Sequence, residues 1–347
     1  METSLSQAYT DTHIPPHQII PLDFESVREL PESHIWTPAV EDRHHNEREE
    51  LLPVPPVIDL GAPDVTELVG NACRRWGMFQ VTNHGVPLGL VDDVEAHARR
   101  LFELPADRKL KALRSPSGAT GYGVARISPF FDKLMWHEGF TIMGSAVDHA
   151  KQLWPHRYEE FCDVMDNYQK KMKSIAYKIL LIALKALGVD EEDEEKISSS
   201  MLYESNGALQ LNSYPSCPNP RQAVGLAPHT DTQLLTILHQ NNTNGLQIFQ
   251  QGIGWIPIPP IPGALVVNLG DLMHILSNAC FHAVYHRVVP NDTSHRFTVG
   301  YFYGPPIEAV VAPLAKLPSP RFRAVTVKEY IGIKNKHLEK SLSLIGI

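Results

Sequence analysis

Residues 296–303 read Arg-Phe-Thr-Val-Gly-Tyr-Phe-Tyr, an alternation that is typical of a β-strand with two different faces. This stretch closes a region, from about 206 to 304, in which short runs of Leu and β-branched residues alternate with Gly, Pro and Asn turns. Many short strands at such spacing indicate a sandwich, a barrel or a jelly roll. The expected strands are 209–214, 234–238, 246–249, 264–268, 283–289 and 296–303.

Helical patterns flank the strand-rich region on both sides. Apolar residues recur at steps of three and four over 157–187, which predicts one long helix that ends at Gly188. Asp64-Val65-Thr66-Glu67 and Thr326-Val327-Lys328-Glu329 have the form of capping boxes and predict helices to about 77 and 342. The sequence also predicts a helix over 88–103, strands over 57–60 and 78–82, and a solvated acidic connection over 190–196.

The composition is that of an ordinary globular protein, with 43% apolar and 20% charged residues among 347. The 31 basic and 39 acidic residues give a formal charge of −8, which argues against binding to a nucleic-acid backbone. No apolar run is long enough for a membrane span, and no secretory signal is recognisable. The four cysteines are scattered, as free thiols are. We expect a monomeric cytoplasmic protein that binds neither nucleic acid nor membrane.

His229-Thr230-Asp231 is the first candidate for chemistry. Residues i and i+2 of a strand point to the same face, so an imidazole and a carboxylate would converge there. Alone the motif is weak, because the chain has 17 histidines and such a pair is equally compatible with a core or surface role. His286, on another expected strand, could add a third ligand, and two histidines with one carboxylate hold non-haem Fe(II) in oxygenases.

Other histidines compete for the third position. The candidates are His239, His274, His282 and His295, and the sequence alone does not exclude His274 or His282. Two histidines and one aspartate could also hold zinc in a hydrolase, with water as the fourth ligand. The metal and its chemistry therefore stay open at this point.

Arg296 and Thr298 share one strand face and predict a carboxylate receptor. The guanidinium offers a bidentate fork and the hydroxyl adds one donor. Asn212 and Tyr214 share a face of an earlier strand, and the Tyr214 hydroxyl could reach the same anion. A zinc hydrolase would not need such a receptor. Taken alone, Arg296 could equally form a structural salt bridge.

These residues carry a resemblance. The sequence resembles the plant 2-oxoglutarate- and Fe(II)-dependent dioxygenases over about residues 50–345. The match rests on Asn212-x-Tyr214, His229-x-Asp231, His286 and Arg296-x-Thr298, in the family's order and spacing. Flanking segments agree: Asn83-His84-Gly85, Gly245-Leu246-Gln247 and Asn268-Leu269-Gly270-Asp271. One departure is Thr298, where the family usually has Ser.

The resemblance implies an α+β fold with a mainly β core, a distorted double-stranded β-helix (jelly roll) flanked by helices. It implies that His229, Asp231 and His286 bind Fe(II), that Arg296, as the catalytic residue, and Thr298 hold 2-oxoglutarate, and that Tyr214 and Asn212 assist. O2 is consumed, ascorbate serves as reductant, and succinate and CO2 are released. We expect one integrated catalytic unit with an N-terminal extension (1–55), a helix-rich part packed on the core (56–200), the jelly-roll core (201–310) and a C-terminal helical segment (311–347).

The stretch from Gly121 to Phe140 lacks a steady period and mixes aromatic residues with Arg126. Such a lining would suit an apolar polycycle that bears an acid, although core packing explains it equally well. The stretch is similar to that of the family's group that hydroxylates gibberellin precursors at the 3-beta position. This similarity implies a small-molecule gibberellin substrate, which we expect to contact Tyr122, Arg126, Phe131 and Trp136.

Other functions remain as alternatives. Gibberellin oxidases of the 2- or 20-position and flavonoid-type oxygenases fit the same motifs, because the metal site is common to all. A hormone-binding protein that keeps a decayed site is a further alternative, against which the intact metal and anion residues count.

Overall fold

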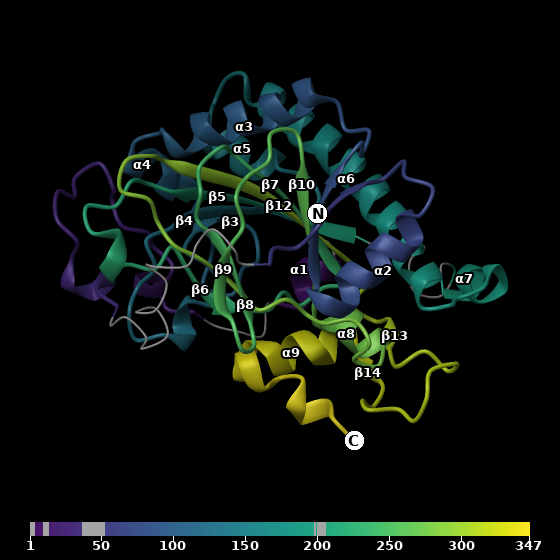
Figure 1. Ribbon diagram of the computed structural model, residues 1–347. Coiled ribbons are helices and arrows are strands. Elements are labelled where there is room, and N and C mark those ends of the chain that lie inside the picture. Colours follow the sequence, from purple (N-terminus) through teal and green to yellow (C-terminus); the bar gives the residue numbers. More distant parts are fainter. Residues whose placement is uncertain (1–3, 10–13, 37–52, 198, 200–205) are drawn as a thin grey trace.

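An eight-stranded sheet forms the larger layer of the computed structural model, which describes residues 4–9, 14–36, 53–197, 199 and 206–347 (Figure 1). Part of the expected N-terminal extension and the expected boundary after residue 200 lie outside the described residues. In spatial order the strands are β1 (Val57–Asp59), β2 (Met78–Thr82), β10 (Leu265–Leu269), β7 (Leu235–Gln240), β12 (Arg296–Gly304), β5 (Asn206–Tyr214), β4 (Glu138–Ile142) and β3 (Gly121–Gly123).

A second sheet of four strands packs against the first. Its order is β6 (Leu226–His229), β11 (His286–Val288), β8 (Leu246–Gln250) and β9 (Gly254–Pro257). Ile248 of this sheet shares a buried apolar cluster with Met78 and Val266 of the larger sheet, so the two inner faces are joined by hydrophobic burial. The predicted jelly-roll core with flanking helices is confirmed.

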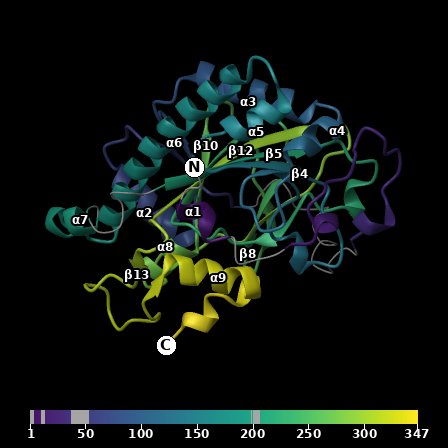
Figure 2. The same ribbon diagram turned by 180° about the vertical axis from the view of Figure 1, so that it is seen from behind.

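The outer face of the larger sheet is covered by helices, which Figure 2 shows from behind. The longest, α6 (Tyr158–Ala186), packs across β5, β7 and β12 through a stripe that includes Phe161, Met165 and Tyr168, all fully buried. Each such side chain stabilises the fold by roughly 1.5–3 kcal/mol. Gly188, with a φ of +79°, follows the helix as predicted.

The remaining helices are shorter and connect or cap the sheets. They are α1 (Ser4–Gln7), α2 (Val65–Arg75), α3 (Leu88–Phe102), α4 (Ala106–Lys109), α5 (Val147–Leu153), α7 (Glu191–Ile197), α8 (Asp271–Leu276) and α9 (Val327–His337), with a small ribbon of β13 (Val310–Val311) and β14 (Val325–Thr326). None of the helices in the described part of the chain has the length and apolar character that crossing a bilayer requires. The helices predicted from capping boxes and periodicity are confirmed as α2, α3, α6 and α9.

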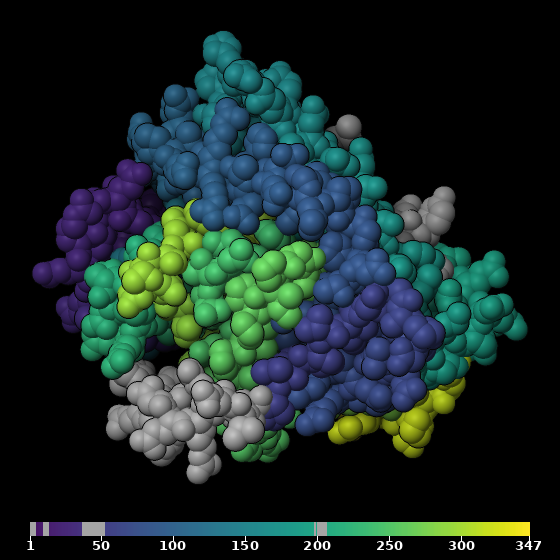
Figure 3. Space-filling model, turned by 45° about the horizontal axis from the view of Figure 1, so that its top comes forward, coloured from purple at the N-terminus to yellow at the C-terminus, as the bar shows by residue number. Residues whose placement is uncertain are grey.

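The N-terminal part does more than cover the core. Between residues 56 and 200, β1 and β2 extend one edge of the larger sheet, and β3 and β4 extend the other. Figure 3 shows residues around 250 (green) at the surface, bordered above and on the right by earlier segments of the chain (blue). The segment expected to be helix-rich therefore also contributes strands to the sheet that holds the core.

Some elements differ from the expectation. The sequence does not predict β4, because all five of its residues are buried and the strand lacks the alternation that reveals a half-buried strand. It does not predict β6 or β9 either, since each has only four residues and contains a proline or glycine. The acidic connection 190–196 is solvated as expected, but it forms the helix α7, which has no buried residues.

Candidate active site

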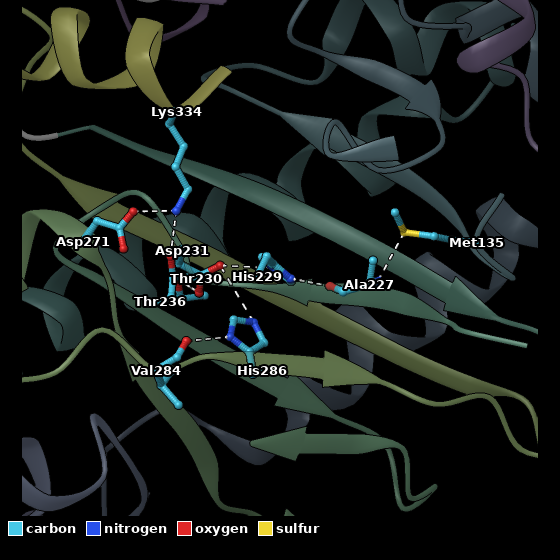
Figure 4. Close-up of polar contacts among 10 residues, drawn as sticks. All are labelled: Met135, Ala227, His229, Thr230, Asp231, Thr236, Asp271, Val284, His286 and Lys334. Carbon is cyan, nitrogen blue, oxygen red and sulfur yellow. Dashed lines mark hydrogen bonds and ion pairs between the residues drawn. The ribbon is translucent and has the colours of Figure 1, made fainter. Parts of the chain in front are cut away.

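The three predicted metal ligands lie together at the inner side of the smaller sheet (Figure 4). His229 ends β6 and pairs directly with His286, the first residue of β11. Asp231 lies just beyond the end of β6, and its Oδ1 is 3.6 Å from Nε2 of His229 and 3.9 Å from Nε2 of His286. One ligand atom from each residue lies within 4.8 Å of the other two, which is close enough to share one metal ion.

Hydrogen bonds behind the triad fix the orientation of each ligand. Nδ1 of His229 is 2.8 Å from the carbonyl oxygen of Ala227, and Nδ1 of His286 is 3.1 Å from that of Val284. Because a carbonyl can only accept, both Nδ1 atoms carry a proton, which leaves Nε2 of each ring as the atom that can bind a metal. Thr236 donates to Oδ2 of Asp231 at 2.7 Å, which leaves Oδ1 for a metal.

The electrostatics of the triad suit a divalent cation. Burial would raise the pKa of Asp231, but His286, His229 and the Thr236 hydrogen bond together hold that pKa below its usual range. Burial, and then the neighbouring His229, lowers the pKa of His286 to about 4. The site therefore presents one carboxylate and a neutral imidazole from His286, which is the protonation that metal binding requires.

The predicted anion receptor lies on the larger sheet, across from the triad. Arg296 of β12 pairs with Tyr214 of β5, and Thr298 pairs with Asn212 two positions further on. Nδ2 of Asn212 donates to Oγ1 of Thr298 at 3.1 Å, so the Thr298 hydroxyl can give its own proton to another acceptor. The guanidinium carbon of Arg296 is 5.2 Å from the centre of the Tyr214 ring.

Arg296 itself is fully buried with part of its hydrogen-bonding capacity unused. Its Nη2 donates to Oε1 of Gln240 at 2.9 Å and the Tyr214 hydroxyl is close enough to affect its pKa, but neither Nε nor Nη1 has a partner with hydrogen-bond geometry. Burial lowers the pKa of Arg296 to about 10, and no described acidic residue forms an ion pair with it. Two free donors on a buried cation are what a carboxylate would satisfy, since an unpaired buried charge is costly. A hydrolytic zinc centre would not need such a carboxylate receptor, so the free donors of Arg296 distinguish this site from one.

Gly245 makes room for the Arg296 side chain. A Cβ at this position would lie 2.8 Å from Cδ of Arg296 and 2.8 Å from the carbonyl oxygen of Val289. Real Cβ atoms do not approach other atoms so closely. A glycine here therefore lets β8 begin directly beside the guanidinium stem.

A cavity of about 200 Å³ opens beside the triad. Its lining includes His229, Asp231 and Asn212, together with two cations, Arg126 and Lys334. His286, Arg296 and Thr298 do not line it and stay buried behind it. The cavity therefore has a polar side at His229, Asp231 and Asn212, while much of the remaining wall is apolar, from Leu5, Phe130, Met143 and Phe302.

Of the four expected substrate contacts, Arg126 alone lines this cavity. The Tyr122 hydroxyl donates to Oε2 of Glu138 at 2.5 Å, inside the core. Trp136 is buried, with Nε1 donating to the carbonyl of Pro215, and Phe131 packs on the Trp36 ring. Tyr122 and Trp136 therefore serve core packing, and the partly buried Phe131 packs outside the cavity. Composition cannot tell which face a ring will occupy.

Lys334 and Tyr9 line the cavity, and the sequence does not predict either of them. Nζ of Lys334 donates to Asp271 at 2.5 Å and to Thr230 at 2.6 Å, so α9 is tied to the start of α8 and to the residue between His229 and Asp231 (Figure 4). A single lysine on a helix and a tyrosine in a proline-rich arm carry no spacing signal. Asp271 belongs to the Asn268–Asp271 motif, but that motif does not reveal its partner.

Known proteins resemble this chain both in sequence and in fold. The family model described as the 2OG-Fe(II) oxygenase superfamily matches residues 205–305, and a model for the N-terminal part of non-haem dioxygenases in morphine synthesis matches residues 55–160. Gibberellin 3-beta-dioxygenase 1 of Pisum sativum is 49% identical, with 99% of this chain and 94% of the relative aligned. Its counterpart of the same name in Arabidopsis thaliana is 49% identical, with 95% and 94% aligned.

A solved structure agrees in fold. The crystal structure of JOX2 in complex with 2OG, Fe and JA superposes with a TM-score of 0.75 at 30% identity, covering 88% of this chain and 89% of the other. Similarity of this extent places the chain in one enzyme class. The chain belongs to the 2-oxoglutarate- and Fe(II)-dependent oxygenase family, in the branch whose curated members are named gibberellin 3-beta-dioxygenase.

Proposed function

We propose that the protein hydroxylates a gibberellin precursor at the 3-beta position to give a bioactive gibberellin. O2 and 2-oxoglutarate are consumed, succinate and CO2 are released, and ascorbate keeps the iron reduced. The reaction type rests on one observation, the buried Arg296 with two free donors on the sheet opposite the His229, Asp231 and His286 triad. The substrate class rests on the relatives' names.

In this proposal His229, Asp231 and His286 bind Fe(II). Two imidazoles and one carboxylate leave the other coordination positions of the metal open for a cosubstrate and O2. The bound iron supplies the oxidising chemistry, which no side chain could supply. The chain contributes orientation, because Ala227, Val284 and Thr236 hold the ligand atoms before the metal arrives.

Arg296 is the residue that seats 2-oxoglutarate. Its free Nε and Nη1 donate to the carboxylate far from the metal, and the Thr298 hydroxyl adds a donor. Asn212 holds Thr298, and the Tyr214 ring lies beside the guanidinium. Because the receptor is on one sheet and the triad on the other, the distance between the sheets selects the length of the dicarboxylic acid. The methyl group of Thr298, where the family usually has Ser, adds packing without removing the donor.

The gibberellin substrate occupies the cavity beside the triad, with its carboxylate at Arg126. Arg114 is buried and Arg126 is largely enclosed, and neither forms an ion pair with an acid among the described residues. Burial, and then the charge of Arg126, lowers the pKa of Arg114 to about 9. An anionic substrate would relieve this excess of enclosed positive charge. The apolar wall suits a fused-ring hydrocarbon skeleton and excludes water from the reacting carbon.

The protein acts as one integrated unit in this proposal, a monomer in the cytoplasm that binds neither nucleic acid nor membrane. The net charge of −8 supports the absence of a nucleic-acid partner. The strands that residues 56–200 add to the larger sheet support a single unit. Light scattering of the purified protein and fractionation of cells that express it test these points.

Product analysis tests the reaction. Purified protein is incubated with gibberellin precursors, Fe(II), ascorbate and 2-oxoglutarate, and the products are identified by mass spectrometry against authentic standards. We expect a 3-beta-hydroxylated gibberellin and one succinate for each hydroxylation. Hydroxylation at carbon 2, oxidation at carbon 20 or conversion of a flavonoid alone would contradict the assignment and identify the alternative. Product without succinate would contradict the reaction type.

A further inference from the structure

The N-terminal segment that contains α1 forms part of the wall of the substrate cavity. Leu5 and Tyr9 line the cavity together with Arg126 and residues of α9. Leu5 and Ala8 are only 4% and 5% exposed, so this short segment is packed into the fold. Figure 2 shows α1 (purple) between the larger sheet and α9, so the start of the chain lies beside its C-terminal helix.

Tyr9 makes direct contact with Arg126, one of the two cations that line the cavity. The guanidinium carbon of Arg126 lies 4.5 Å from the centre of the Tyr9 ring, and Nη2 donates to the Tyr9 carbonyl at 3.3 Å. Nη1 donates to the carbonyl of Gly118 at 2.7 Å, so the guanidinium is held between the N-terminal segment and that loop. Nε of Arg126 is buried and has no partner, which leaves one donor for a ligand.

The ring face of Tyr9 is the feature that only an aromatic residue provides. A guanidinium over a ring is attracted by the ring quadrupole, and the attraction strengthens when water is excluded. Tyr9 also lines the cavity, beside Leu5 and Arg126 in the same wall. Loss of the ring would therefore leave Arg126 held only by the two backbone carbonyls and would enlarge the space for the substrate.

We propose that Tyr9 is a specificity-determining residue, whose ring holds Arg126 in place for the substrate carboxylate and limits how an apolar polycyclic acid can lie over the metal site. The proposal rests on the proposed function, because it assigns a wall to the same cavity. It gives the N-terminal arm a part in the choice of substrate and of the carbon that reacts.

Three variants and one control test the proposal. Tyr9→Ala removes the ring, Tyr9→Leu keeps apolar bulk without a ring face and protects against a failure to fold, and Tyr9→Phe keeps the ring. Ile20→Ala is the control, because Ile20 is an N-terminal aliphatic residue that is 43% exposed. For each variant the Michaelis constants for the gibberellin precursor and for the cosubstrate, the product per succinate and the position of the hydroxyl are measured.

We expect Tyr9→Ala and Tyr9→Leu to raise the Michaelis constant for the precursor about tenfold, which is the size of one lost cation–π contact in a dry site. Product per succinate should fall, additional hydroxylation positions should appear, and the Michaelis constant for the cosubstrate should not change. Tyr9→Phe and Ile20→Ala should stay within about twofold of the parent.

Unchanged precursor kinetics in Tyr9→Leu would overturn the proposal. So would equal rises in both Michaelis constants, which would show a general structural role, or a Tyr9→Phe variant as impaired as Tyr9→Leu. The parent enzyme separates this test from the proposed function. If it hydroxylates no gibberellin, the function fails; if it does so and Tyr9→Leu matches it, the inference alone fails.

Discussion

Thr236 decides which oxygen of Asp231 faces the two histidines. Its hydroxyl donates to Oδ2 at 2.7 Å, and both groups are buried. We expect Thr236→Val, which keeps the shape but removes the donor, to weaken Fe(II) binding by about 10- to 100-fold, the usual effect of losing a hydrogen bond behind a metal ligand. Titration of the protein with Fe(II) under anaerobic conditions measures the change.

Thr243→Val is the matched control for Thr236→Val. Thr243 is also buried, and its hydroxyl donates to the carbonyl of His295, outside the triad. The two variants should lose similar stability, and only Thr236→Val should lose metal affinity. Equal Fe(II) affinities in the two variants would show that Thr236 does not orient Asp231.

Arg296 provides a second test at the scale of one side chain. A lysine would keep the charge but lose the planar fork that matches a carboxylate. We expect Arg296→Lys to raise the Michaelis constant for the cosubstrate by about 10- to 100-fold, which corresponds to one lost charge-assisted hydrogen bond. The Michaelis constant for the gibberellin precursor should change little. Initial rates at varied concentrations of 2-oxoglutarate measure this, with the exposed Arg323→Lys as control.

The sequence predicts site residues most directly where they share a strand or a short spacing; it leaves His286 one of several candidates before the resemblance is considered, and it misses Lys334 and Tyr9. Arg296 and Thr298 are two residues apart on one strand, so their common face follows from backbone geometry. Asp231 lies beyond the end of β6, so the argument from strand alternation does not apply to it, although its carboxylate still approaches His229. Lys334 lies on α9, and only the tertiary structure brings this helix to the site.

At the level of elements, α9 begins with a side-chain cap. Thr326 accepts a hydrogen bond from the backbone N–H of Glu329 at 3.1 Å. We expect Thr326→Ala to lower the free energy of unfolding by about 1 kcal/mol. Urea denaturation of the parent and the variant measures the loss.

The start of α2 supplies the control for the α9 cap. Asp64 occupies the same position at the start of that helix, but its side chain makes no capping hydrogen bond. Asp64→Ala should therefore cost no more than about 0.5 kcal/mol, the range of an exposed substitution. If both substitutions cost the same, the Thr326 hydroxyl contributes nothing particular to α9.

The elements that can be predicted are those with one buried face. Apolar residues recur at steps of three and four along α6, and side chains alternate along β12. Both patterns arise because the two faces of the element meet different surroundings. β4 is enclosed between β3 and β5 and buried on both faces, so its composition resembles that of any core segment. The acidic run of α7 has no apolar face, so the sequence indicates a connection there and not a helix. The structure agrees that no residue of this helix is buried.

Across the whole molecule, buried neutral histidines make stability depend on pH. Burial lowers the pKa of His137 to about 4, and burial does the same for His34. In the unfolded chain these imidazoles titrate near about 6.5, so between pH 6.5 and 4 the unfolded state binds more protons. Above pH 6.5 their full contribution to the free energy of unfolding is present. This contribution is lost as the pH falls toward 4, by on the order of 1 kcal/mol for each histidine between pH 6.5 and 5.

Urea denaturation at about pH 7, 6 and 5 measures this dependence. His137→Asn should flatten it, because the variant lacks one group that gains a proton on unfolding. His17→Asn should not, since His17 is exposed. Parallel pH profiles for the parent and His137→Asn would show that His137 is not held neutral by the fold.

The triad belongs to the smaller sheet and the carboxylate receptor to the larger one. Neither sheet alone can hold both the metal and the dicarboxylic acid, so a chain in which the two layers have separated lacks a complete site. Iron together with its dicarboxylic acid would bridge the two layers, and a cell short of either should hold a more easily unfolded form of the protein.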